Sequence, residues 1–181
     1  MNKFRLAVSG ILGRQQYYLA RRKPVSIDPQ QITISLDELD PRSVFIFIDE
    51  ILLRGLSVEQ TSLYRMALAG YNIRRRIGRE GELLQLVRYE DFESYYKRCL
   101  LLAESIAKHG VLDIDRAPAD LMTRNEKNVR ILIREDGALY HYRRGKHRLA
   151  IARALGISMM PVDIYCNSLA GWRACRRLTT Q

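Results

Sequence analysis

The stretch YHYRRGKHRLAIARALGISMMPVDIY, residues 140–165, decides which fold this chain adopts. Alternating aromatic residues lead to Gly145, which stands just before a nearly uncharged apolar helix. A second alternating run follows the helix and contains Pro161 near its start. Alternation is typical of a half-buried strand, and small apolar residues all round a helix indicate burial. We therefore expect a strand, a glycine turn, a buried helix over about 147–155 and a strand over 160–165. The cations around the glycine are Arg143, Arg144, Lys146 and Arg148.

The segments before this stretch predict a long helix and a β-hairpin. A helix is expected over 91–109, ended by Gly110, with one apolar face. The runs 129–134 and 138–143 alternate and are joined by an Asp-Gly turn signal, which predicts a hairpin. The expected helix face consists of Phe92, Tyr95 or Tyr96, Cys99, Leu102 or Ala103, and Ile106.

The first half of the chain predicts shorter elements. QITISL (31–36) alternates and VFIFI (44–48) is a short apolar run, so each is expected to be a strand. A capping box at Ser57 opens a helix that continues to about Ala69. The basic run NIRRRIGREGE (72–82) is expected to be a surface loop. This mixed order predicts the α+β class, with a small mixed sheet and packed helices.

The composition fits an ordinary globular protein. Of the 181 residues, 47% are apolar and 28% are charged, and no apolar run reaches the ~18 residues that a membrane span needs. Cys99, Cys166 and Cys175 are far apart and odd in number, which indicates a reducing compartment rather than a disulfide framework or a zinc site. Residues 1–25 show no signal peptide, so we expect a cytoplasmic protein.

The net charge of +10 is concentrated in two parts of the sequence. Residues 1–25 hold six cations and no acid, and residues 137–181 hold eight Lys or Arg against Asp163 alone. Such clusters attract an anionic partner, either a nucleotide, a nucleic acid or an anionic membrane. The amphipathic spacing within 1–25 suits peripheral contact with the inner face of the membrane, a partner protein or this chain's own domain. A solvated basic surface is the alternative reading.

Gly145–Arg148 is the candidate phosphate-binding loop. The first N–H groups of a helix and its dipole favour an anion, and a glycine lets the anion approach the backbone closely. Lys146 would add a point charge, and Arg148 would add a fork that binds oxygens in pairs. His147, at the helix start, would donate to a phosphate. Solvated cations at the end of a hairpin are the alternative.

LLAESIAKHGVLD (101–113), the opening stretch and QITISLDELDP (31–41) resemble the ParB/sulfiredoxin-like superfamily. That family pairs a Ser-Ile helix with a Gly-x-x-Arg loop, an Ala-rich helix and a Val-Pro-Val-like strand. The resemblance covers about 30–165, with a helical insertion at 45–95. It implies a domain over 26–166, between a basic amphipathic arm at 1–25 and a basic tail at 167–181.

The resemblance implies a nucleotide-phosphate-binding fold. Branches of the family bind or hydrolyse CTP, phosphorylate small molecules such as free serine, or use ATP to repair oxidised cysteine. Gly145–Arg148 matches the family's phosphate loop, and Ser105 lies on the helix that faces that loop. Lys146 stands where a sulfiredoxin has its reactive cysteine, so sulfiredoxin chemistry is not expected. No helix-turn-helix is recognisable, so a stand-alone member is expected.

The expected function is a small phosphotransferase (kinase) or NTPase that uses ATP, ADP or CTP with Mg²⁺. A looser likeness to ParB-like proteins found with surface-polysaccharide genes suggests a small or glycan-linked acceptor. Phosphoryl transfer needs a carboxylate base. The resemblance to the kinase-like branch of the family implies Glu38 and Asp40 as the candidates, ahead of Asp49 and Glu50. Three histidines without carboxylate spacing predict no protein-built metal site.

Two alternatives to an enzyme stay open. One is a DNA-binding regulator that uses the two basic ends of the sequence, which should lose affinity steeply with salt. The other is a nucleotide-gated switch without turnover. Arg74, Arg75 and Arg76 are candidates for contact with a nucleic acid backbone or an anionic substrate, and a solvated loop is the alternative.

Overall fold

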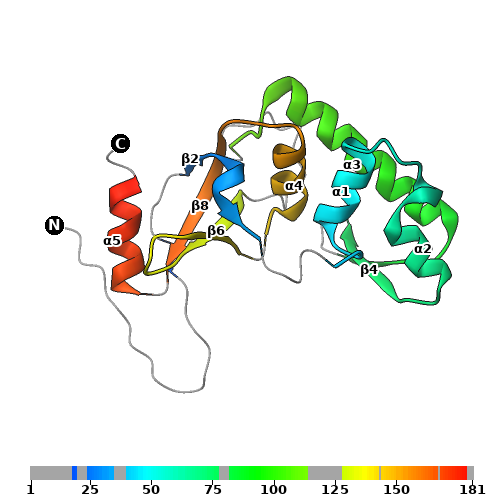
Figure 1. Ribbon diagram of the computed structural model, residues 1–181, viewed down its shortest axis with the longest axis horizontal. Coiled ribbons are helices and arrows are strands. Elements are labelled where there is room, and N and C mark those ends of the chain that lie inside the picture. Colours follow the sequence, from blue (N-terminus) through cyan, green and yellow to red (C-terminus); the bar gives the residue numbers. More distant parts are fainter. Residues whose placement is uncertain are drawn as a thin grey trace, which may run out of the picture.

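A computed structural model describes residues 18–19, 24–34, 40–77, 82–113, 128–142, 144–166 and 168–178. Within these ranges the chain combines one six-stranded sheet, one two-stranded sheet and several helices. Figure 1 shows the main sheet on one side of helix α4 (Lys146–Ala154) and further helices on the other side. The α+β class expected from the sequence is confirmed.

The main sheet is built around one long strand. Its strands are β1 (Tyr18–Leu19), β2 (Val25–Ile27), β3 (Ile32–Thr33), β6 (Val129–Ile133), β7 (Leu139–His141) and β8 (Met160–Cys166). β8 pairs in parallel with β6 on one side, and in antiparallel fashion with both β1 and β2 on the other. β6 and β7 form the expected hairpin, and β3 adds a parallel pair at the far edge.

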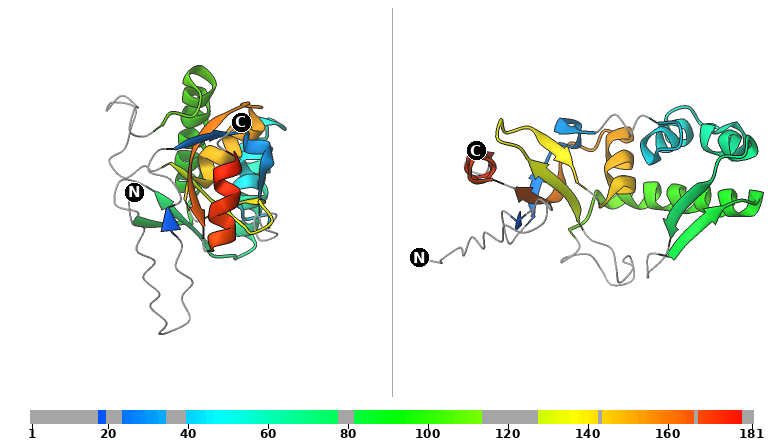
Figure 2. Two further views of the ribbon diagram at one scale, coloured as in Figure 1. Left: turned by 90° about the vertical axis from the view of Figure 1, so that its left-hand side faces the viewer. Right: turned by 90° about the horizontal axis from the view of Figure 1, so that it is seen from below.

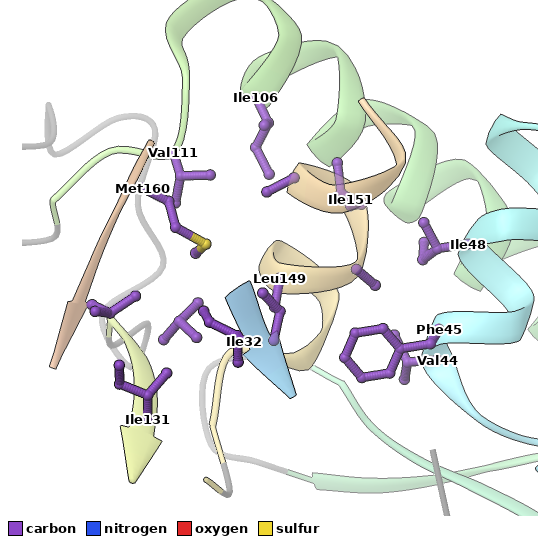
Figure 3. Close-up of a cluster of buried hydrophobic side chains, with 14 of the residues drawn as sticks. Ile32, Val44, Phe45, Ile48, Ile106, Val111, Ile131, Leu149, Ile151 and Met160 are labelled. Atoms are coloured by element: carbon purple, nitrogen blue, oxygen red, sulfur yellow. The ribbon is translucent and has the colours of Figure 1, made fainter. Parts of the chain in front are cut away.

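The remaining elements lie around α4 or beyond it. They are η1 (Pro29–Gln31), α1 (Val44–Leu52), η3 (Val58–Gln60), α2 (Ser62–Leu68), β4 (Ile73–Ile77), β5 (Glu82–Leu86), α3 (Tyr89–His109) and α5 (Leu169–Leu178). Both α1 and α3 pack against α4 (Figure 3). Figure 2 shows α5 at the end of the molecule opposite α1 and α2.

Helix α3 forms as expected. Gly110, at φ 70°, ends it, and the predicted apolar face is the buried face. Its buried side chains are Phe92, Tyr95, Cys99, Ala103 and Ile106. The single helix expected from Ser57 to about Ala69 is divided in two. The short helix η3 follows the capping box between Ser57 and Gln60, and α2 begins after Thr61, whose backbone is extended and whose hydroxyl accepts from the N–H of Tyr64.

The expectation of a strand at 44–48 is wrong, because these residues open α1. The hydroxyl of Ser43 accepts hydrogen bonds from the N–H groups of Phe45 and Ile46, which caps the helix. The apolar run continues to Leu52, and its side chains meet neighbours on more than one side, as in a buried helix. A short apolar run has no period that separates such a helix from a buried strand.

The expectation of a basic loop at 72–82 is also wrong. Residues 73–77 and 82–86 are the strands β4 and β5, paired antiparallel from Ile73↔Leu86 to Ile77↔Glu82. Ile73 and Leu86 are both buried, so their pair anchors the ribbon to the rest of the protein. Charged residues can occupy such a ribbon because a two-stranded sheet needs only one buried end or face.

The structure differs from two further expectations in the length or nature of the element. The strand expected over 31–36 is limited to Ile32–Thr33 and follows η1, while residues 35–39 lie outside the described ranges. The tail expected at 167–181 contains α5, which packs on β6 and β8. Of residues 1–25, only 18–19 and 24–25 are described, so the amphipathic arm stays a prediction.

Candidate phosphate-binding site

The turn between β7 and α4 is shaped by Gly145. Its backbone is left-handed, with φ 81° and ψ 20°. A Cβ at this position would lie 2.7 Å from Cγ2 and 2.8 Å from Cα of Val129, closer than carbon atoms approach in proteins. Only glycine satisfies both the dihedral angles and the contact. The turn is thus pressed onto the first residue of β6.

Helix α4 begins immediately after this glycine. The N–H of Leu149 donates to the carbonyl of Gly145 at 3.0 Å, which closes the first turn. The N–H groups of Lys146, His147 and Arg148 precede that bond, and the first N–H groups of a helix have no acceptor within the helix. Glycine also has no side chain with which to cap them. The helix dipole adds a partial positive charge at the same place.

Burial fixes the first turn of α4. Arg148 is 9% exposed, and Leu149 and Ile151 are fully buried among core side chains (Figure 3). A guanidinium keeps its charge in proteins, so Arg148 is a buried positive charge beside the start of the helix. Lys146 is half-buried. The four residues expected to bind phosphate therefore form one rigid turn.

A contact with α3 holds the turn in place. The hydroxyl of Tyr95 lies 2.7 Å from Nε2 of His147, and the two rings meet edge to face. The ring of Phe47, from α1, packs on Tyr95 with the centroids 5.0 Å apart. His147 is thus oriented by a hydrogen bond from a helix 52 residues earlier in the sequence.

The residues before Gly145 are bonded to the sheet. Nε2 of His141 lies 3.0 Å from the carbonyl oxygen of Arg144, and the His141 ring meets the ring of Phe45 at the start of α1. The N–H of Arg130 also donates to that carbonyl, at 3.3 Å. Strand β6 and the first turn of α1 thus support the turn from two sides.

Ser105 is not brought to this turn. It follows Tyr95 by ten residues on α3, which corresponds to about 15 Å along the helix axis. Figure 3 shows its neighbour Ile106 beside Ile151, near the later turns of α4. Ser105 therefore lies toward the end of α4 that is remote from Gly145.

The two carboxylates expected to act as a base have different positions. Glu38 lies outside the described residues. Asp40 lies in the turn before α1, where its carboxylate accepts two hydrogen bonds of 2.8 Å from the guanidinium of Arg42 and one of 2.7 Å from the Arg42 N–H. The bond to Asp40 raises the pKa of Arg42. A carboxylate held in this way shapes the turn and is a poor base.

Asp49 and Glu50 are also placed away from the turn. Glu50 is buried and accepts hydrogen bonds from the N–H and hydroxyl of Ser62, so it caps α2. Burial raises the pKa of Asp49, while Arg153 and Arg54 lower it. Because Arg153 lies in the last turn of α4, Asp49 is near the end of that helix opposite Gly145.

The other expected contacts are located only in part. Arg74, Arg75 and Arg76 are on β4, opposite Gln85, Leu84 and Leu83 of β5.

Among the residues that the structure describes, no group of three or more His, Cys, Asp or Glu side chains is arranged to hold a metal ion. No helix in the same ranges has the length and apolar character needed to cross a membrane.

Sequence reasoning missed two residues of this site. Tyr95 was expected only as a core residue, although a tyrosine on a buried helix face usually needs a partner for its hydroxyl. Val129 gives no chemical signal in the sequence, because its role is to lie against Gly145.

No protein-family model, curated protein or solved structure matches this chain.

Proposed function

We propose that this chain binds a nucleoside phosphate (ATP, ADP or CTP, with Mg²⁺) at the turn Gly145–Arg148. The observation that carries the proposal is Gly145, whose left-handed backbone starts α4 and whose missing side chain lets the turn rest on Val129. Backbone N–H groups, one half-buried lysine and one buried arginine then occupy a single helical turn. This combination suits phosphate oxygens.

The described residues fit a nucleotide that brings its own Mg²⁺. Magnesium in nucleotide sites is held mainly by phosphate oxygens and water, with one or two protein carboxylates. Binding of a nucleotide together with Mg²⁺ therefore does not require a cluster of several carboxylates in the protein. The described residues contain no such cluster. The resemblance of residues 140–165 to the phosphate loop of the ParB/sulfiredoxin-like superfamily supports the same ligand.

The reaction we propose is phosphoryl transfer to a small or glycan-linked acceptor, or to water. Lys146 and Arg148 would stabilise the charge that develops on the phosphoryl oxygens. Asp40 is engaged by Arg42, which leaves Glu38 as the better candidate for the base. His147 would be oriented for a hydrogen bond to the nucleotide by Tyr95.

Calorimetric titration of ATP, ADP and CTP with Mg²⁺ tests the binding step. Lys146→Gln removes one charge from the turn, and Arg148→Lys keeps the charge but removes the fork. Each should weaken binding about tenfold or more, as expected for a charge-assisted hydrogen bond. Lys108→Gln, on the exposed surface of α3, is the matched control and should bind like the wild type.

Failure of the wild-type chain to bind all three nucleotides would overturn the proposal. Equal weakening by Lys146→Gln and Lys108→Gln would place the nucleotide elsewhere. Circular dichroism spectra of the variants separate lost binding from lost fold. If the wild type binds a nucleotide, the release of phosphate is then measured for wild type and for Glu38→Gln. An enzyme should release phosphate and lose this activity in Glu38→Gln, whereas a nucleotide-gated switch should show no turnover.

A further inference from the structure

The main sheet has one face under helices and a second face that reaches solvent. Side chains alternate between the two faces along each strand. On the first face the side chains of β6 and β8 are buried, where the turn at Gly145 rests on Val129 and Gly171 of α5 packs on Cys166. The second face carries the residues between them, which are half-buried or exposed. They are Arg130, Leu132 and Arg134 of β6, Tyr140 and Tyr142 in or next to β7, and Pro161, Asp163 and Tyr165 of β8.

Tyrosines lie on both sides of β6 on this second face. Leu132 pairs with Tyr140 of β7 on one side and with Tyr165 of β8 on the other. The backbones of these two tyrosines are therefore two strand spacings apart, about 10 Å. The ring of Tyr142 lies 6.0 Å from the ring of Tyr165, measured between the ring centres. The second face thus presents aromatic rings across the middle of the sheet.

Two arginines lie over these rings. The guanidinium of Arg134 is 3.9 Å from the ring centre of Tyr140, and the guanidinium of Arg130 is 5.0 Å from the ring centre of Tyr165. A cation over an aromatic ring is attracted by the negative face of the ring. Arg134 is also exposed. Each pair therefore combines an aromatic ring with a positive charge at a fixed position.

The charges of the two arginines are not neutralised by the part of the protein that the structure describes. Neither Arg130 nor Arg134 forms an ion pair with a described carboxylate. Asp163 is opposite Arg130 in the register of β6 and β8, but its carboxylate accepts from the amide of Asn128 at 3.3 Å. Nε of Arg130 is buried and has no hydrogen-bond partner among the described residues. Because an unsatisfied buried donor costs free energy, this face favours an anionic, hydrogen-bond-accepting ligand.

We propose that this face binds a single-stranded nucleic acid. Unpaired bases stack on aromatic rings and on guanidinium planes, and the arginine charges attract the phosphates. A duplex hides the faces of its bases, and its major groove admits a helix or a two-stranded ribbon rather than a wide sheet. We call this surface the tyrosine face, and it consists of Arg130, Arg134, Tyr140, Tyr142 and Tyr165.

The tyrosine face is separate from the proposed nucleotide site. Gly145 rests on Val129, which belongs to the first face of the sheet, whereas the neighbouring Arg130 belongs to the second. The inference therefore does not rest on the proposed function. Lys146→Gln, which should weaken nucleotide binding, should leave the binding of a single strand unchanged.

The test is the fluorescence anisotropy of labelled single-stranded DNA and RNA of about 12 nucleotides, with the DNA duplex for comparison, using the full chain at about 50 mM KCl. Tyr140→Leu/Tyr165→Leu removes two rings and keeps apolar side chains. Tyr140→Phe/Tyr165→Phe is its control, because it keeps both rings. Arg134→Gln removes one exposed charge from the tyrosine face. Its matched control is Arg65→Gln, an exposed position on α2, which lies far from the main sheet (Figure 1).

We expect wild type to bind at least one of the two single strands roughly tenfold or more tightly than the duplex. The leucine variant should bind that strand roughly tenfold or more weakly than wild type, and the phenylalanine variant should bind it within about twofold of wild type. Arg134→Gln should bind about threefold more weakly, while Arg65→Gln should bind like wild type. Circular dichroism spectra show which variants fold.

The tyrosine face would be the wrong assignment if the leucine and phenylalanine variants bound with equal affinity. Binding of the duplex as tightly as of the single strands would also overturn the proposal. So would failure of wild type to bind either single strand at about 50 mM KCl, whether or not it binds phosphatidylserine vesicles. If the leucine variant does not fold, the comparison of Arg134→Gln with Arg65→Gln decides, and equal affinity of these two variants would overturn the proposal.

Discussion

Among single residues, Gly145 has the largest effect on the candidate site. Its left-handed backbone ends the short connection from β7 and starts α4, and its missing side chain lets the turn rest on Val129. The left-handed backbone and the close contact with Val129 are two independent reasons for a glycine. Gly156, which follows α4, is also left-handed, at φ 65°, but a Cβ there would meet no atom within 4 Å.

Gly145→Ala should therefore destabilise the protein more than Gly156→Ala. Alanine in a left-handed backbone costs about 1 to 2 kcal/mol at either position. At Gly145 the clash with Val129 adds a cost like that of overpacking, for a total of roughly 3 kcal/mol. Urea denaturation of both variants measures the difference, and equal losses would contradict the packing described for the turn.

A second residue-scale prediction concerns Tyr89, at the start of α3. Its hydroxyl donates to Glu59 at 2.6 Å, and this hydrogen bond raises the pKa of Tyr89 to about 12. Because the folded pKa is raised, the bond contributes fully below the ordinary tyrosine pKa of about 10 and is lost as pH rises through about 12. The same bond lowers the pKa of Glu59.

The difference in ultraviolet titration between wild type and Tyr89→Phe isolates this ionisation. It should centre near pH 12 in the native background and near pH 10 when both chains carry Glu59→Gln. A difference curve centred near pH 10 in the native background would show that the Tyr89–Glu59 bond is absent in solution.

Among the elements, α1 shows how a cap decides between two structures. The run VFIFI fits a strand and a helix equally by its apolar content. Ser43, immediately before it, supplies the hydroxyl that satisfies two of the first N–H groups of the helix. Once formed, α1 packs along α4 and places Phe45 against His141 beside the candidate site.

Ser43→Ala should destabilise the protein by about 1 kcal/mol, because two N–H groups at the start of α1 lose their acceptor. Ser43→Asp, another good capping residue, should restore most of that loss. Ser158→Ala, at an exposed serine after α4, is the control and should be close to neutral. Thermal or urea unfolding measures all three, and a neutral Ser43→Ala would mean that the cap is unimportant.

The elements that sequence reasoning predicted correctly have strong local signals. α3 has a continuous apolar face and a glycine end, β6 and β7 have an Asp-Gly turn, and α4 is apolar between two glycines. The basic ribbon β4–β5 was expected to be a loop because its run of arginines was taken as a sign of a loop. The pairing of Ile73 with Leu86, which makes it a ribbon, has no local signal in the sequence. Charge content describes what a segment presents to water, and it does not show whether its backbone is paired.

At the scale of the whole molecule, the contacts that complete the site join distant segments. Tyr95 and His147 are 52 residues apart, and Phe45 of α1 meets His141, which follows it by almost 100 residues. No local pattern specifies such pairs, since each depends on how the sheet and helices pack. Gly145–Arg148 could be proposed from the sequence because the four residues are contiguous, whereas the contact of Tyr95 and the position of Ser105 required the fold.

The packing of α5 also makes a prediction about the cysteines. Cys99, Cys166 and Cys175 are all buried, and burial together with the neighbouring Cys175 raises the pKa of the Cys166 thiol. A raised pKa leaves less thiolate at neutral pH, and thiolate is the reactive form. A disulfide reagent should therefore modify none of the three in the native chain within minutes and all three in urea.

Removal of residues 168–181 should expose Cys166 and make it reactive, because α5 covers the end of β8. The same truncation with Cys166→Ser assigns the new reactivity to that thiol. Fast modification of Cys166 in the intact chain would contradict the position of α5.

The most direct test of the central claim is an amide-resolved nuclear magnetic resonance titration of the ¹⁵N-labelled chain with Mg²⁺ and ATP, ADP or CTP. We expect the largest saturable shifts at Gly145, Lys146, His147 and Arg148, with smaller shifts at Val129 and Tyr95. Lys146→Gln should reduce these shifts at equal nucleotide concentration. Saturable shifts confined to other parts of the chain, or no shifts with any of the three nucleotides, would contradict the proposed site.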